Sequence, residues 1–190
     1  MTDKCPRCGT GMVLQKAAIS SSRQSLLYCQ KCQTTIFLDS GKDQDQPGLQ
    51  ENSSHKPKIL LVDDDTDLLT VLDMQFKTSG FDTVLASNGE EAYAKLVETT
   101  PDLVMTDIFL PTIDGWELST KIRHSSELGY IPIIMITGIY TGPEFKAKAL
   151  EHGVNAFVTK PYNQETLLNI ANHLIEQFSS TALATSSSAS

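Results

Sequence analysis

The chain has 190 residues, 40% of them hydrophobic and 20% charged, which fits a soluble protein with one medium-sized domain or a domain plus a small module. Its longest apolar run, near residues 131–136, is far too short for a membrane-spanning helix, and residues 1–9 lack the apolar core of a signal peptide, so we expect a cytoplasmic protein with no membrane partner. The net charge of −8 is unevenly spread, from +3 in residues 1–39 to −10 in residues 57–178, and such an acidic body repels nucleic acid.

Residues 1–39 contain all four cysteines, arranged as two CxxC pairs separated by twenty residues: Cys5, Cys8, Cys29 and Cys32. In a chain without a secretion signal, paired cysteines indicate metal binding before disulfides, and this spacing is typical of a zinc site with four cysteine ligands. Residues 12–14 and 25–28 alternate like the strands of a hairpin. The module resembles a zinc ribbon. Because so short a module cannot bury enough surface to fold unaided, bound Zn²⁺ would drive its folding.

Two alternatives to zinc are a pair of disulfides and an iron site of rubredoxin type. The predicted compartment disfavours disulfides, and an iron site normally has more aromatic packing than Tyr28 and Phe37 supply. The local charge of +3 permits nucleic-acid contact, but scattered basic residues are also what any soluble face carries. We therefore expect the module to bind a protein partner. Residues 40–56, rich in Gly, Pro, Gln, Asp and Ser, predict a flexible linker.

Residues 57–178 alternate between short apolar segments and amphipathic ones. Strands are predicted near residues 58–62, 83–86, 103–106, 131–136 and 156–159, and helices near residues 68–76, 89–97, 116–122, 144–152 and 167–178. Gly80 and Gly153 follow two of the helices, and Asn88 precedes another as a cap. Five strand–helix units predict an α/β fold with one doubly wound parallel sheet. Residues 179–190 are small and polar and predict a disordered tail.

Charged and hydroxyl side chains follow four of the five predicted strands. The first strand ends in Asp63, Asp64 and Asp65, and the later ones lead to Asp107, Thr137 and Lys160. Ligands of such sheets bind at the carboxyl ends of the strands, so these side chains should meet at one edge. Each alone is more often a cap, a turn residue or a surface residue, and Asp65 or Thr66 should cap the first helix. Together they favour a site in which converging carboxylates hold Mg²⁺.

Four segments carry a family resemblance: ILLVDDD (59–65), DLVMTDIFLPTIDGWEL (102–118), IPIIMITG (131–138) and AFVTKPY (156–162). They resemble the receiver domain of bacterial two-component response regulators. The resemblance covers about 120 residues, within residues 57–178, and implies a flavodoxin-like five-stranded parallel sheet in the order 2-1-3-4-5.

The resemblance also implies a role for each site residue. Asp107 matches the phosphoacceptor, which takes a phosphoryl group from phosphohistidine on a sensor histidine kinase. Asp64 matches a direct Mg²⁺ ligand, Asp63 its partner acting largely through water, and the backbone carbonyl of Phe109 a further ligand. Lys160 would neutralise phosphoryl charge and Thr137 would bond a phosphoryl oxygen. Thr137 and Phe157 match the conformational switch, although Phe157 also fits as a half-buried strand residue and lacks the hydroxyl of the tyrosine common there.

The function expected from the sequence is therefore phosphorelay signalling to a downstream protein partner, with the zinc ribbon as an interaction module. The chain would not be an enzyme beyond its own phosphoryl transfer and slow autodephosphorylation. A transcriptional regulator whose ribbon contacts nucleic acid is the alternative. A haloacid-dehalogenase-like phosphatase would carry its nucleophile after the first strand in an Asp-x-Asp-x-Thr pattern, and Asp67 occupies the place of that threonine.

Overall fold

A computed structural model describes residues 13–19, 22–28, 35–38, 56–138, 145, 148–149 and 151–185 of the chain, with the side chains from residue 56 to residue 178. The described strands and helices, in chain order, are β1 (Val13–Ile19), β2 (Ser22–Tyr28), β3 (Thr35–Leu38), β4 (Lys58–Val62), α1 (Thr66–Thr78), β5 (Asp82–Ala86), α2 (Gly89–Thr99), β6 (Leu103–Asp107), α3 (Gly115–His124), β7 (Ile133–Thr137), β8 (Ala156–Thr159) and α5 (Gln164–Thr185).

Five of the strands form the predicted parallel sheet. Their spatial order is β5-β4-β6-β7-β8, and each neighbouring pair is parallel. Numbered by their sequence within this sheet, the strands follow the order 2-1-3-4-5, so the predicted topology is confirmed. Such a sheet reverses its direction of winding between β4 and β6, which is where the carboxyl ends of the strands leave room for a ligand.

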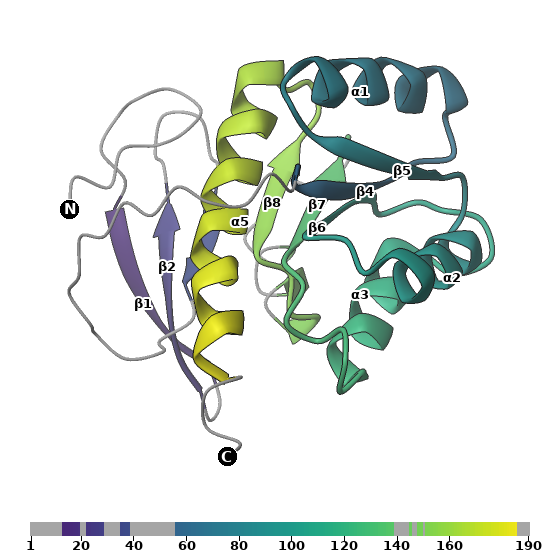
Figure 1. Ribbon diagram of the computed structural model, residues 1–190. Coiled ribbons are helices and arrows are strands. Elements are labelled where there is room, and N and C mark those ends of the chain that lie inside the picture. The colour runs from purple at the N-terminus through teal and green to yellow at the C-terminus, as the bar shows by residue number, and fades with distance from the viewer. Residues whose placement is uncertain are drawn as a thin grey trace.

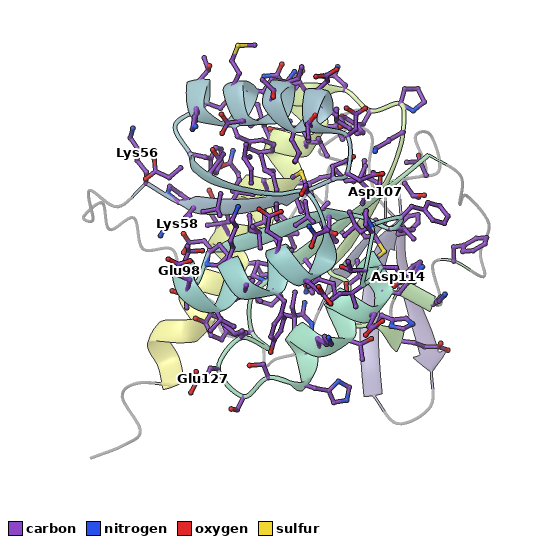
Figure 2. All side chains as sticks on the ribbon, turned by 90° about the vertical axis from the view of Figure 1, so that its right-hand side faces the viewer. Lys56, Lys58, Glu98, Asp107, Asp114 and Glu127 are labelled. Atoms are coloured by element: carbon purple, nitrogen blue, oxygen red, sulfur yellow. The ribbon has the colours of Figure 1, made fainter. Side chains whose placement is uncertain are left out.

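Helices cover both faces of this sheet (Figure 1). Alternate residues of β4 point to opposite faces: Ile59 and Leu61 pack with α1 and α5, whereas Leu60 and Val62 pack with α2 and α3. Both sets are buried, which explains why the β4 sequence is an uninterrupted apolar run. Figure 2 shows Asp107, at the end of β6, on the side of the sheet opposite Lys58. The polar ends of the strands therefore share one edge.

Side-chain caps begin the helices that follow the site strands. The carboxylate of Asp65 accepts hydrogen bonds from the N–H groups of Asp67 and Leu68, which confirms the predicted cap of α1. Asn88 caps α2 and Asp114 caps α3 in the same way. The caps fix where each loop turns into a helix, and so they hold the strand ends in place.

The N-terminal strands extend the sheet. β1 and β2 pair as an antiparallel hairpin, as the alternating sequence predicts, and β2 pairs with β3. β3 in turn pairs antiparallel with β8, which brings the sheet to eight strands. Nothing in the sequence predicted this last pairing, which satisfies the edge of β8.

The remaining helical segments lie before Gly153 and at the C-terminal end of the described chain. Residues 145, 148, 149 and 151 are helical, as expected, and Gly153 adopts a positive φ of 70° after them. α5 continues to Thr185, into the segment 179–190 that was predicted to be disordered, because Ala182, Leu183 and Ala184 favour a helix and no glycine or proline ends it. The predicted linker falls almost entirely outside the described residues. None of the described helices is long and apolar enough to span a membrane.

Candidate functional site

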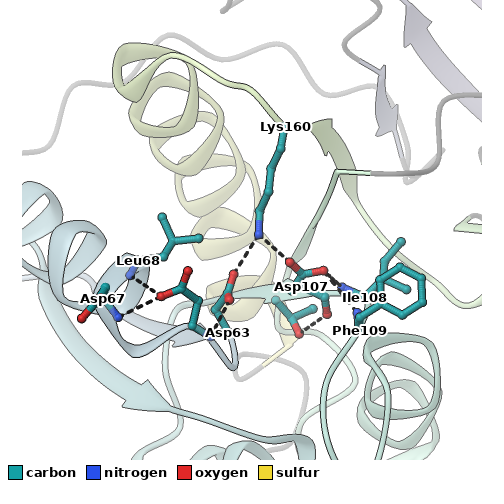
Figure 3. A network of polar contacts seen from close by, with 9 residues as sticks. Asp63, Asp67, Leu68, Asp107, Ile108, Phe109 and Lys160 are labelled. Carbon is teal, nitrogen blue, oxygen red and sulfur yellow. Dashed lines mark hydrogen bonds and ion pairs between the residues drawn. The ribbon is translucent and has the colours of Figure 1, made fainter.

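Three charged side chains from three strand ends meet at the carboxyl edge of the sheet (Figure 3). Lys160, directly after β8, places its Nζ 3.0 Å from Oδ2 of Asp63 and 2.5 Å from Oδ2 of Asp107. Asp63 follows β4, and Asp107 is the last residue of β6. The predicted convergence of these residues therefore occurs, over sequence separations of 97 and 53 residues. The Lys160–Pro161 peptide bond is cis.

The Asp107 carboxylate is held at both oxygens. Its Oδ1 accepts hydrogen bonds from the N–H groups of Ile108, at 2.5 Å, and Phe109, at 3.2 Å, while Oδ2 accepts from Lys160. The residue is 9% exposed, so it is nearly enclosed but still reaches solvent. A carboxylate that is fixed in this way has a defined orientation for attack, which is what a nucleophile requires.

Asp63 carries a charge that burial disfavours. It is 5% exposed, and its Oδ1 accepts a hydrogen bond of 3.0 Å from the N–H of Asp65. Burial raises the pKa of Asp63 and outweighs the hydrogen bonds from Asp65 and Lys160, which act to lower it. The neighbouring negative charge of Asp107 adds to the rise. Asp63 and Asp107 thus share a single ammonium group.

Lys160 stays charged in this environment. Burial acts to lower its pKa, but the hydrogen bonds to Asp107 and Asp63 and their negative charges raise it above the usual value. The side chain is 27% exposed, so the ammonium can still move within the site. A compact cation on a flexible stem is suited to follow negative charge that is added beside it.

The donor set fits a hard divalent cation. Two buried carboxylates with one lysine carry a net charge of −1, and exposed Asp64 stands next to Asp63 and adds another. Mg²⁺ prefers a few carboxylate oxygens and retains several waters, so it suits a partly open acidic edge. Within residues 56–138 and the later described segments, no three acidic, histidine or cysteine side chains already form a compact metal group. Lys160 instead occupies the space between two of the carboxylates.

The predicted switch residues lie on either side of this site. Thr137 ends β7 and is fully buried, and its carbonyl accepts a hydrogen bond of 2.7 Å from the N–H of Lys160. Phe157 is 4% exposed and lies outside the charged cluster, on the face of the sheet that α2 and α3 cover. Its ring stacks on Trp116 of α3, with centroids 6.4 Å apart and planes inclined by 18°.

Two residues near the site were not singled out by the sequence. Gly115 begins α3 so close to β6 that a Cβ there would lie 2.3 Å from the carbonyl oxygen of Asp107. The Asp-Gly pair at residues 114–115 was the available signal. Trp116 begins the helix predicted near residues 116–122, and its contact with Phe157 joins residues far apart in sequence. The four predicted zinc ligands, Cys5, Cys8, Cys29 and Cys32, lie outside the described residues.

Comparison with known proteins agrees with this geometry. The family model for the response regulator receiver domain matches residues 59–172. The chain is 38% identical over 107 residues to the alkaline phosphatase synthesis transcriptional regulatory protein PhoP of Bacillus subtilis, covering 56% of this chain and 43% of PhoP. It is 29% identical to protein PilG of Pseudomonas aeruginosa, covering 67% of this chain and 94% of PilG.

Solved structures show the same likeness. The chemotaxis response regulator CheY4 of Vibrio cholerae matches with a TM-score of 0.60 and 29% identity, over 63% of this chain and 99% of CheY4. The chain spans less than half the length of PhoP, so the match concerns the receiver and not the remainder of that protein. The chain belongs to the response regulator receiver family, whose members accept phosphoryl groups and are not classical enzymes.

Proposed function

We propose that the chain is a two-component phosphorelay signalling protein whose receiver accepts a phosphoryl group on Asp107. The observation that carries this proposal is the meeting of Asp63, Asp107 and Lys160 at the carboxyl edge of the sheet. It pairs a fixed carboxylate nucleophile with a cation that can neutralise incoming negative charge. Receiver domains in general interact with sensor histidine kinases, and such a kinase is the proposed phosphoryl donor.

The proposed reaction is an in-line displacement at phosphorus. An oxygen of Asp107 attacks the phosphorus of a phosphohistidine, the phosphorus–nitrogen bond breaks, and the freed imidazole takes its proton from solvent. Lys160 follows the transferred group and bonds one of its oxygens, while the hydroxyl of Thr137 bonds another. The N–H groups of Ile108 and Phe109 hold the remaining carboxyl oxygen in place. Most of the work is positioning and charge stabilisation.

Receiver domains generally bind Mg²⁺ at the phosphorylation site, where the ion neutralises phosphoryl charge. In this chain Asp63, Asp64 and Asp107 would hold it, together with the backbone carbonyl of Phe109. Buried Asp63 and exposed Asp64 suit the unequal roles of a water-mediated and a direct ligand. Because Lys160 contacts both buried carboxylates, its ammonium would have to give up part of this contact for the two carboxylates to hold the ion.

The proposal is tested by incubating the full chain with acetyl phosphate and Mg²⁺ and following its mass. Wild type should gain one phosphoryl group that hydroxylamine removes, whereas Asp107→Asn should gain none. Asp65→Asn is the matched control, because it makes the same change at the same edge of the sheet and keeps the cap of α1. It should react within about threefold of the wild-type rate. Wild-type labelling of Asp107→Asn would refute the assignment.

We further propose that the N-terminal part is a zinc-binding module. The antiparallel register pairs Val13 with Tyr28 and Tyr28 with Thr35, so the start of β1, the end of β2 and the start of β3 share one end of the sheet. Both CxxC pairs adjoin these strand ends in sequence, which supports a single four-cysteine site holding Zn²⁺. Purified protein should contain about one zinc per chain, and iron in its place would contradict the proposal.

The module would serve as a contact for a downstream protein and would be joined to the receiver by the linker proposed at residues 40–56. A nucleic-acid contact is the second candidate, favoured by the local charge of +3 and by the transcriptional regulators among the relatives. Binding of the zinc-loaded full chain to a DNA fragment library separates the two. Binding that is lost on chelation would support the second candidate, and its absence together with a phosphorylation-dependent protein complex would support the first.

A further inference from the structure

β3 covers the outer edge of β8. Thr35 pairs with Phe157 and Ile36 with Ala156, and both belong to the first half of β8. On its other side β8 pairs with β7 over its whole length. The N-terminal strands lie before residue 59, where the receiver match begins, so they are an addition to the receiver in this chain. An uncovered sheet edge is a site for strand addition, and in this chain β3 fills it.

The residue that β3 pairs with is tied to the phosphorylation site. The backbone of Phe157 pairs with Thr35 on one side and Met135 on the other, while its buried ring stacks on Trp116. Three residues further on, Lys160 contacts Asp107 and its N–H bonds the carbonyl of Thr137. β8 therefore joins the pairing with β3, in its first half, to the charged cluster, directly after its last residue.

From this geometry, and resting on the proposed phosphorylation of Asp107, we propose that the β8 edge is an interaction surface that β3 occupies before phosphorylation and leaves after it. Phosphorylation would thus release the N-terminal strands from the β8 edge of the same chain.

The direction follows from the groups that must move. In the present arrangement Lys160 bridges Asp63 and Asp107, and β8 is held against both β7 and β3. Phosphorylation replaces the single carboxylate charge of Asp107 with a phosphoryl group of about −1.5 to −2 and draws Lys160 away from Asp63. The backbone N–H of Lys160 is bonded to the carbonyl of Thr137, so a pull on the Lys160 side chain acts on the end of β8 and on β7. β7 is buried at every position and belongs to the parallel sheet that helices cover on both faces, whereas β3 is the added neighbour of β8, so the β3 contact is the one that opens.

Amide hydrogen exchange in the full chain tests this. With Mg²⁺ but without acetyl phosphate, the amides of residues 35–36 and 156–157 that point across the β3–β8 pairing should exchange slowly. After acetyl phosphate and Mg²⁺ have labelled Asp107 fully, as mass spectrometry verifies, their exchange should accelerate at least tenfold, while residues 133–137 should change less than twofold. Asp107→Asn under the same conditions should show no change. Fast exchange of residues 35–36 before labelling, or unchanged or slower exchange after it, would overturn the inference. Failure to label Asp107 would instead count against the proposed function.

A pair of proline variants gives an independent readout. Thr35→Pro disturbs a position that pairs with both β2 and β8. Leu38→Pro disturbs a position that, among the described residues, pairs with β2 but not with β8. Where docking of β3 opposes phosphorylation, weakening the docked state removes part of that opposition, and abolishing docking favours phosphorylation by at most the factor by which phosphorylation weakens docking. Thr35→Pro should therefore accept phosphate several-fold faster than wild type, and Leu38→Pro within twofold. Equal rates in the two variants would refute the coupling.

Discussion

Replacing Gly115 with alanine should misplace the nucleophile without touching any charged group. Gly115 begins α3, its N–H donates a hydrogen bond of 2.8 Å to the carbonyl of Ile108, and its Cα faces the backbone of Asp107. A Cβ at this position would lie 2.3 Å from the carbonyl oxygen of Asp107 and 3.0 Å from Cα of Ile108. Backbone atoms cannot rotate away, so β6 and α3 must separate by about 1 Å to reach ordinary van der Waals distance.

The expected cost has two parts. Forcing extra volume between packed backbone segments typically costs about 1–3 kcal/mol, and the better helix propensity of alanine returns up to ~1 kcal/mol, so the free energy of unfolding should fall by about 1–2 kcal/mol. A displacement of about 1 Å at a reacting group can cost on the order of 100-fold in rate. We therefore expect phosphorylation of Gly115→Ala by acetyl phosphate to be roughly 10- to 100-fold slower.

Urea unfolding and the rate of labelling at Asp107 measure the two parts separately. Trp116, the single tryptophan of the chain, adjoins Gly115 and reports the local shift by its fluorescence. Gly138→Ala is the matched control, because the nearest atom to its Cβ would be Cβ of Lys160 at 3.9 Å, which is ordinary contact. Labelling and stability of Gly115→Ala that equal those of the control would refute the reasoning.

Three further predictions concern charge and water at or near the site. Lys160→Met leaves Asp63 and Asp107 without their shared cation, so the free energy of unfolding at pH 7 should fall by about 1–3 kcal/mol. Because burial raises the pKa of Asp63, the loss should shrink as the pH falls and Asp63 takes up its proton, and a loss that stays constant over the whole acid range in which wild type remains folded would contradict this. Hydrogen bonds from Lys95, and then from Ser87, lower the pKa of Glu91 to about 2 from 4.5. Glu91→Gln should therefore lower the free energy of unfolding above pH 4.5 by about 1 kcal/mol, after allowance for a side chain that is 35% exposed. In urea titrations this loss should become progressively smaller as the pH falls toward 2. The side chain of Phe109 is 48% exposed, and its apolar ring can exclude an attacking water but cannot orient one. Phe109→Asn should therefore shorten the lifetime of phosphorylated Asp107 in magnesium by several-fold. A wild-type lifetime of seconds that is unchanged in the variant would contradict this role of Phe109.

The sequence by itself determined most of the receiver. Strands buried on both faces are apolar over most of their length, so β4 and β6 could be recognised from the apolar runs at residues 59–62 and 103–105. Caps act locally, and Asp65 and Asn88 were identifiable for that reason. The charged residues at the strand ends could be assigned to one edge because the carboxyl ends of parallel strands meet there, although Asp63 and Lys160 are 97 residues apart in sequence.

Only the tertiary structure shows the features that depend on close approach between segments far apart in sequence. The need for glycine at residue 115 arises from the backbone of Asp107, and the stacking of Phe157 on Trp116 joins β8 to α3. No local pattern encodes such distances. The pairing of β3 with β8 is of the same kind, because backbone hydrogen bonds between strands carry almost no side-chain signature and any open sheet edge can accept them. The sequence predicted two modules, and the sheet edge that joins them became visible only once the chain was folded.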